Sequence, residues 1–177
     1  MRRAVFLDRD GVLNYGVIRD GKPYPPDSVA EVRIVEDAPS ALRKLHDAGF
    51  LLIVVTNQPD VARGKQTAAG VEAIHDVLRA ALPIDEFLAC YHDDADHCDC
   101  RKPKPVLLLE AAKRHGIDLA ASFMIGDRWR DVEAGQRAGC VAYFLDYEYA
   151  ERQPEPPFVR VRSLTEAADQ ITRTSGG

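Results

Sequence analysis

Short apolar runs alternate along the chain with segments whose apolar residues recur at helical spacing. A continuous apolar run is typical of a strand buried on both faces, and helical spacing is typical of a helix with one buried face. The predicted strands are Ala4–Leu7, Leu51–Val55, Phe87–Tyr91, Phe123–Ile125 and Val141–Leu145, with Phe158–Val161 as a last edge strand. The predicted helices are Pro39–Ala48, Thr67–Leu82, Pro105–His115, Asp131–Ala138 and Leu164–Ile171. Because strand and helix alternate, the sequence predicts the α/β class, with a Rossmann-like parallel sheet covered by helices on both faces.

The chain shows no internal repeat and no change of composition that would divide it. At 177 residues, we expect a single domain over residues 1–177. The segment 15–32 follows the first strand and is predicted to be a long irregular insertion, which in a domain of this size is usually functional or disordered. His46, His75 and His115 fall within predicted helices, where we expect them at the surface or at helix ends.

Composition and charge narrow the functional classes. Hydrophobic residues make up 46% of the chain, and 23 Lys and Arg against 28 Asp and Glu give a formal charge of −5. No basic run stands out, so nucleic acid is not an expected partner. No apolar stretch approaches the roughly 18–20 residues that span a membrane, and the N-terminus has no leader pattern. We therefore expect a cytoplasmic protein, monomeric by default, that acts on a small molecule.

Polar side chains follow four of the predicted strands. Their carboxylates, hydroxyl, amide and ammonium groups suit phosphate or a hard cation, and they belong to Asp8, Asp10, Thr56, Asn57, Lys102, Asp127 and Asp131. In an open parallel sheet, ligands bind outside the carboxyl ends of the strands. Polar residues also cap strands without any function, but four consecutive ends with such groups favour a site.

Two aspartates two residues apart, Asp8 and Asp10, end the first strand, and Asp127 ends the fourth. Close carboxylates raise one another's pKa values, and Mg²⁺ removes this conflict because it prefers oxygen ligands and often binds a phosphate oxygen as well. A carboxylate beside Mg²⁺ can attack phosphorus, and a neighbouring carboxylate can act as general acid and base. Thr56 and Lys102 are suited to stabilise the transferring phosphoryl group.

A second group of residues has the composition of a zinc site. Cys90, His92, Cys98 and Cys100 offer three thiolates and one imidazole, which form a closed tetrahedral set for zinc. His97 is a rival to His92, and a reduced, solvated loop is the alternative without metal. Since Arg101 and Lys102 follow directly, a zinc clamp would stiffen the loop that presents them. Cys140 lies in an apolar run and is expected to be a small buried residue.

The stretches "DRDGVLN", "VVTNQ", "CRKP" and "GDRWRD" occur in this order and resemble the four motifs of the haloacid dehalogenase superfamily of phosphatases. The resemblance covers about residues 4–145. It implies Asp8 as nucleophile, Asp10 as general acid and base, and Thr56 and Lys102 as phosphate stabilisers. It also implies Mg²⁺ held by Asp8, Asp127 and the carbonyl of Asp10, with Asp131 orienting groups around them. The intervals between the motifs are too short for the large cap domain of many members.

The predicted zinc-binding loop, residues 90–100, is called the zinc loop below. It is similar to that of a small capless branch of the superfamily, whose members act on heptose bisphosphates or histidinol phosphate. This similarity implies that Arg101 contacts the substrate beyond the scissile phosphate, with Arg63 of "TNQPDVARGK" as a further candidate and Asn57 also near the substrate. The heptose enzymes usually carry Ser-Gly in place of Pro59-Asp60, and Gly in place of Val106.

The leading hypothesis is a Mg²⁺-dependent phosphatase that converts D-glycero-D-manno-heptose 1,7-bisphosphate to heptose 1-phosphate. The first alternative is histidinol phosphate or another sugar phosphate as substrate. A phosphatase of nucleic-acid ends and a non-catalytic module that binds through the zinc loop are more distant alternatives.

Overall fold

The computed structural model describes residues 1–20 and 22–174, so residues 21 and 175–177 of the predicted 1–177 unit lie outside the described residues. Within the described part of the chain, six parallel strands form one sheet in the order β5-β4-β1-β6-β7-β8. The strands are β1 (Ala4–Leu7), β4 (Leu51–Asn57), β5 (Glu86–Cys90), β6 (Phe123–Gly126), β7 (Val141–Leu145) and β8 (Val159–Val161). The predicted parallel α/β sheet is confirmed, and β8 lies at its edge as expected.

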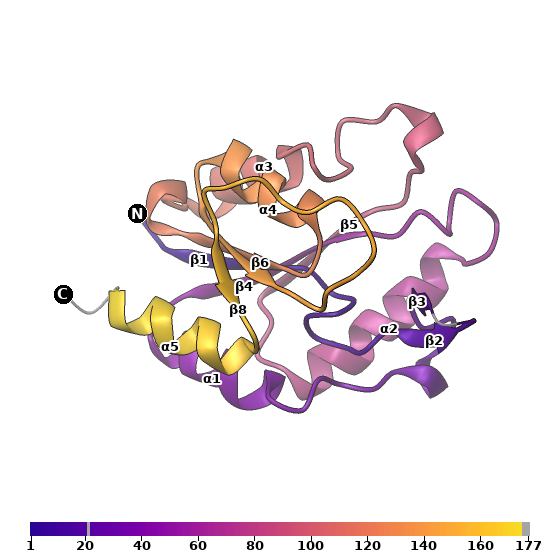
Figure 1. Cartoon of the computed structure of the whole chain (residues 1–177), viewed down its shortest axis with the longest axis horizontal. Helices are drawn as coiled ribbons and strands as arrows, with labels where there is room; N and C mark the ends of the chain where they lie inside the picture. Colours follow the sequence, from indigo (N-terminus) through magenta and orange to yellow (C-terminus); the bar gives the residue numbers. More distant parts are fainter. Residues whose placement is uncertain (21, 175–177) are drawn as a thin grey trace.

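Helices cover both faces of the sheet (Figure 1). They are α1 (Ala38–Asp47), α2 (Ala68–Ala81), α3 (Val106–His115), α4 (Trp129–Ala138) and α5 (Leu164–Thr174). The apolar residues of α1, α2 and α5 share one buried cluster with one face of the sheet, and those of α3 and α4 share another with the opposite face. Strand residues therefore alternate between two cores, which explains why the strands read as continuous apolar runs. No helix among the described residues has the length and apolar character needed to cross a membrane.

Several boundaries differ from the prediction by one to three residues, and two of these differences affect the site. Strand β4 continues through Thr56 and Asn57, which pair with Ala89 and Cys90 of β5. Helix α4 begins at Trp129 rather than Asp131, so Asp131 lies in the first turn, where its Oδ2 accepts a hydrogen bond from the Arg128 N–H at 3.0 Å. A carboxylate in this position satisfies a backbone donor that the start of the helix leaves free.

The segment 15–32 was predicted to be irregular, but parts of it have regular structure. It holds the antiparallel strands β2 (Val17–Arg19) and β3 (Lys22–Tyr24) and the short 3-10 helix Val29–Glu31. Short polar strands with a proline carry little strand signal in sequence. No separate cap domain occurs among the described residues, and this small hairpin lies beside α2 in Figure 1.

The expected surface position of His75 is wrong, because its side chain is fully buried. The ring stacks on Phe87 with centroids 4.5 Å apart, and Nδ1 lies 3.2 Å from Glu72 Oε1. Nε2 has no hydrogen-bond partner within residues 1–20 and 22–174. Burial, together with the nearby charge of Arg9, lowers the pKa of His75 to about 4.

Acid should therefore destabilise the protein through His75. The folded-state pKa lies below the unfolded value of about 6.5, so the unfolded chain binds a proton first as the pH falls. The free energy of unfolding should drop by about 2 kcal/mol between pH 7 and pH 5 through this group alone. In urea titrations, His75→Gln should lose that part of the pH dependence, whereas the exposed control His46→Gln should keep it. If the free energy of unfolding changed equally with pH in both variants, His75 would have its ordinary pKa in the folded protein.

Candidate active site

A buried lysine joins the predicted nucleophile to the aspartate that was predicted to orient groups around the site. Lys102 is 2% exposed, and its Nζ donates to Asp8 Oδ1 at 2.9 Å and to Asp131 Oδ1 at 2.6 Å. A third hydrogen bond, of 2.6 Å, reaches the carbonyl oxygen of Val55. All three ammonium donors are thus used, which fixes Asp8 and Asp131 in the interior.

The backbone of Lys102 is fixed from β4. The Asn57 side chain accepts a hydrogen bond from the Lys102 N–H at 3.0 Å and donates to the Lys102 carbonyl at 3.1 Å. Because β4 extends by two residues, Asn57 pairs with Cys90, the residue at which the zinc loop begins. Asn57 was predicted near the substrate, and the structure shows a positioning role towards Lys102.

Three carboxylates meet around this lysine. Oxygens of Asp8, Asp127 and Asp131 all lie within 4.8 Å of one another. Burial and the charge of Asp131, opposed by Lys102, raise the pKa of Asp8 to about 6. Burial and the charges of Asp8 and Asp131 raise the pKa of Asp127 well above its usual value. One lysine does not compensate this charge, so the cluster calls for a further cation.

The oxygens that remain free fit Mg²⁺. Both Asp131 oxygens are already hydrogen-bonded, to Lys102 and to the Arg128 N–H. By contrast, Asp127 Oδ1 is buried without a partner among the described residues. Mg²⁺ takes oxygen ligands of this kind from one or two carboxylates and keeps waters for the rest. Asp8 and Asp127 are therefore the side chains that suit the metal, and Asp131 supports them through Lys102.

Gly11 leaves the space that Asp127 occupies. A Cβ at Gly11 would lie 2.0 Å from Asp127 Oδ2, and the residue has a φ of +83°. Any other residue here would displace the carboxylate and strain the turn that follows Asp10. The glycine of "DRDG" is thus required by the close approach of two strand ends.

The Asp10 carboxylate points into a separate network. It accepts hydrogen bonds from Arg9 Nη2 at 3.0 Å, Asn14 Nδ2 at 3.0 Å and Gln58 Nε2 at 2.8 Å. Burial acts to raise the pKa of Asp10, but Arg9 and these hydrogen bonds hold it below its usual value. Gln58 also donates to Thr56 Oγ1 at 2.9 Å, so one amide links the two predicted catalytic groups.

Sequence reasoning missed Tyr149, which lies in the loop after β7. Its hydroxyl donates to Asp127 Oδ2 at 3.0 Å. The Arg128 guanidinium lies 5.0 Å from the centre of its ring and forms an ion pair with Glu151 at 2.9 Å. A tyrosine outside the four motifs carries no signal in sequence, because only the fold brings this loop back to the site.

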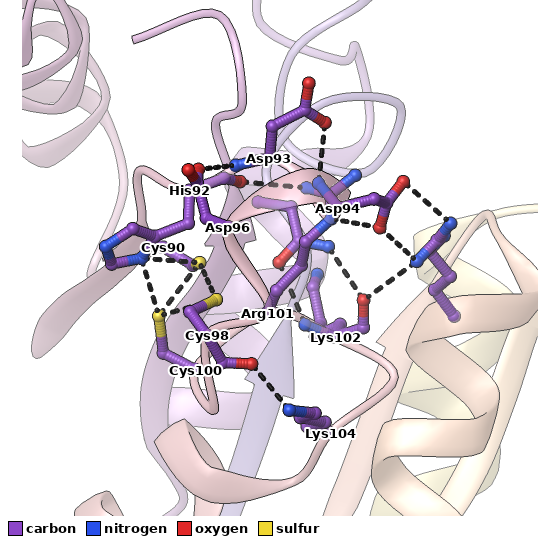
Figure 2. Close-up of polar contacts among 12 residues, drawn as sticks. Cys90, His92, Asp93, Asp94, Asp96, Cys98, Cys100, Arg101, Lys102 and Lys104 are labelled. Atoms are coloured by element: carbon purple, nitrogen blue, oxygen red, sulfur yellow. Dashed lines mark hydrogen bonds and ion pairs between the residues drawn. The ribbon is translucent and has the colours of Figure 1, made fainter. Parts of the chain in front are cut away.

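The predicted zinc ligands form a compact cluster at the end of β5 (Figure 2). Sulfur atoms of Cys90 and Cys98 lie 3.6 Å apart, as do those of Cys98 and Cys100, and His92 Nδ1 lies 3.3 Å from Cys100 Sγ. Donors about 2.3 Å from one tetrahedral ion lie roughly 3.8 Å apart, which is close to most of these distances. The Sγ atoms of Cys90 and Cys100 lie closer, at 2.9 Å, so these two sulfurs would move apart to bind zinc. Burial raises the pKa of Cys90, which disfavours a free thiolate there without a cation. The rival His97 is not among the clustered residues, and Cys140 is buried elsewhere, as expected.

The two predicted substrate arginines line a cleft of about 550 Å³ that opens onto Asp8. Both are ion-paired with the zinc loop: Arg63 Nε donates to Asp93 at 2.7 Å, and Arg101 Nε donates to Asp94 at 2.8 Å. Asp60, one of the two departures after the second motif, also lines the cleft and accepts from Arg63. The other cationic groups on its wall belong to Arg19, Lys65, Lys102, Arg128 and Arg130.

Comparison with known proteins gives the chain a family. Residues 26–139 match the model of the haloacid dehalogenase-like hydrolases. The D-glycero-beta-D-manno-heptose-1,7-bisphosphate 7-phosphatase of Helicobacter pylori is 33% identical over 96% of this chain and 97% of its own. The enzyme of the same name from Bordetella bronchiseptica is 34% identical over 81% of this chain and 80% of its own. A crystal structure of D,D-heptose 1,7-bisphosphate phosphatase from B. bronchiseptica, complexed with magnesium and phosphate, matches with a TM-score of 0.84, 28% identity, and coverage of 97% of this chain and 99% of that one.

Removal of the Tyr149 hydroxyl should weaken Mg²⁺ binding. Groups that orient a metal ligand typically contribute tenfold or more to affinity, so Tyr149→Phe should raise the Kd of Mg²⁺ about tenfold. Titration of Mg²⁺ against the thermal unfolding midpoint gives the Kd without any activity assay. Tyr147→Phe is the matched control, because its hydroxyl donates to the Gly11 carbonyl and not to a carboxylate. A Kd unchanged by Tyr149→Phe would contradict this role.

Loss of one sulfur should abolish zinc binding. Cys100→Ser removes a soft ligand from the cluster and should yield protein without stoichiometric zinc, as measured by elemental analysis. Cys140→Ala removes a thiol outside the cluster and should retain the metal. If Cys100→Ser keeps the wild-type zinc content, the cluster is not the zinc site.

Proposed function

The chain belongs to the haloacid dehalogenase-like hydrolases, and from that premise we propose that it is a Mg²⁺-dependent phosphatase acting on D-glycero-D-manno-heptose 1,7-bisphosphate, with release of the 7-phosphate. The observation that carries the chemistry is the cluster of Asp8, Asp127 and Lys102, in which Asp127 Oδ1 has no partner among the described residues. Mg²⁺ bound there by Asp8, Asp127 and the Asp10 carbonyl would supply positive charge to the transferring phosphoryl group.

Asp8 is the proposed nucleophile. The Lys102 hydrogen bond to Oδ1 holds the carboxylate in place. One of its two oxygens would attack phosphorus, and the other would hold Mg²⁺. A bond forms between the Asp8 oxygen and phosphorus as the bond from phosphorus to the sugar oxygen breaks, which gives an aspartyl phosphate. Lys102 remains protonated throughout, since Asp131 and Asp8 raise its pKa although burial alone would lower it.

Asp10 is the proposed general acid and base. Arg9, Asn14 and Gln58 orient its carboxylate, which allows proton exchange with a group in a fixed place. Asp10 would take up a proton as the substrate binds and give it to the leaving sugar oxygen as the bond from phosphorus to that oxygen breaks. After the sugar departs, the ionised Asp10 takes a proton from the water that attacks the aspartyl phosphate.

Thr56 and Lys102 are proposed to stabilise the phosphoryl group. The Thr56 side chain is 1% exposed and is not among the residues that line the cleft. Its Oγ1 accepts the Gln58 hydrogen bond, so its own hydroxyl hydrogen would be available to a phosphate oxygen held close against Asp8. The Lys102 charge lies against the same carboxylate that attacks. Fixed donors of this kind lower the barrier because they need no reorganisation during the reaction.

Histidinol phosphate is the second candidate, and one observation favours it. Asp60 lines the cleft where the heptose enzymes usually have a small residue, and a carboxylate there suits the ammonium group of histidinol. The cations Arg63, Arg101 and Arg130 on the same wall favour a substrate with a second phosphate. We further propose that the protein acts as a monomer in the cytoplasm, where a reduced zinc cluster is stable.

Phosphate release should separate these substrates. With Mg²⁺ present, we expect kcat/KM for heptose 1,7-bisphosphate to exceed that for histidinol phosphate at least hundredfold, which is roughly 2.7 kcal/mol in transition-state binding. Metal-stripped protein is the control and should be inactive until Mg²⁺ is restored. A preference for histidinol phosphate would transfer the substrate assignment to the second candidate.

Asp8→Asn should abolish turnover while the fold and thermal midpoint are retained. The amide keeps the size of the side chain but is a far weaker nucleophile. Asp99→Asn, at an exposed aspartate that pairs with Lys104, is the matched control and should keep wild-type activity. Undiminished phosphate release by Asp8→Asn would contradict the mechanism.

A further inference from the structure

The zinc loop carries an aspartate, Asp94, whose position is fixed although the proposed chemistry does not use it. Asp94 opens the 3-10 helix Asp94–Asp96, which lies between the cluster residues His92 and Cys98. The Asp94 N–H donates to Asp93 Oδ1 at 2.7 Å, and the Asp93 N–H donates to Asp96 Oδ2 at 2.7 Å. The turn therefore has a cluster residue on each side, and these two hydrogen bonds restrict its conformation.

Asp94 holds two arginines that come from different parts of the chain (Figure 2). Arg101 Nε donates to its Oδ1 at 2.8 Å, and Arg130, in the first turn of α4, donates from Nη1 at 3.3 Å. A further hydrogen bond joins Arg130 Nη2 to Oδ2 at 3.4 Å. One carboxylate thus keeps two guanidinium groups together whose like charges would otherwise separate them.

Arg101 and Arg130 line the cleft. Among the described residues, Asp94 does not line it, so it lies behind the two arginines. Arg101 uses Nε for Asp94 and Nη1 for the His92 carbonyl, at 3.4 Å. Its Nη2 has no partner within the described part of the chain, so donors remain for a ligand in the cleft. Arg130 uses Nη1 and Nη2 for Asp94, and Nη1 also reaches the Lys102 carbonyl at 3.4 Å. For a phosphate in the cleft, Arg101 would therefore supply a donor and Arg130 mainly its positive charge.

We propose that Asp94 is a positioning residue that holds Arg101 and Arg130 as a pair to bind the second phosphate of the substrate. The proposal rests on the proposed function, because it requires a substrate with two phosphates. Under this proposal the zinc loop contributes to substrate specificity, because the cluster fixes the turn from which Asp94 reaches both arginines. If Asp94 instead occupied the arginines in competition with substrate, its removal would tighten substrate binding, so the two roles predict opposite changes in KM.

Asp94→Asn tests the proposal with two substrates that differ only in the second phosphate, heptose 1,7-bisphosphate and heptose 7-phosphate. The variant should raise KM for the bisphosphate about tenfold, the effect of one charge-assisted hydrogen bond, and change kcat little. KM for heptose 7-phosphate should stay at the wild-type value. Asp99→Asn, in the same loop but paired outside the cleft with Lys104, should change neither. In the Arg130→Gln background, Asp94→Asn should have a smaller effect than in the wild type, because the two residues act together.

Three outcomes would overturn the proposal: an unchanged KM for the bisphosphate, a lower KM, or an equal rise for both substrates. Arginine side-chain NMR of the zinc-loaded protein tests the positioning without any substrate. Asp94→Asn should shift and broaden the Nε–H signals of both Arg101 and Arg130, and unchanged signals would overturn the proposal even if the enzyme acts on another compound. Absence of wild-type turnover of the bisphosphate, with these signals altered, would instead count against the proposed substrate.

Discussion

The three hydrogen bonds of the Lys102 ammonium group are the constraint on which the site depends. Burying a lysine is costly unless its charge is paired and every donor is used, and Asp8, Asp131 and the Val55 carbonyl meet that demand. Those partners come from β1, α4 and β4, so the site forms only when the sheet is assembled. One lysine does not neutralise the three carboxylates around it, and this excess of negative charge is what favours Mg²⁺ at the proposed site.

Loops outside the catalytic motifs refine this centre in two ways. The loop after β7 returns Tyr149 to Asp127, so that one carboxylate oxygen is fixed and the other stays free. The zinc loop fixes Asp94, which gathers cations at the wall of the cleft. In a fold without a large cap among the described residues, such loops are the elements that would select the substrate under the proposed function.

Sequence predicted the sheet, its helices and most of the site, because buried parallel strands and their polar ends follow simple patterns. The grouping of Cys90, His92, Cys98 and Cys100 was also predictable, since metal ligands within one loop need no tertiary information. Tyr149 and the Asp94 pairing were not, because each depends on contacts between segments far apart in the chain. The burial of His75 was missed for another reason: a histidine on a helix carries no sign of which face it occupies.

The central claim is that Asp8 is the nucleophile and becomes an aspartyl phosphate during turnover. Trapping this intermediate tests the claim most directly. The unaltered protein should carry a phosphoryl group when it is mixed with Mg²⁺ and heptose 1,7-bisphosphate and quenched with acid within the first turnover. The Asp10→Asn variant is unsuitable for this trap, because it would lack the acid of the first step as well as the base of the second. Peptide mass spectrometry should then find the added phosphoryl group on Asp8. A burst of released sugar while the Asp8 peptide stays unmodified would contradict the proposed covalent intermediate.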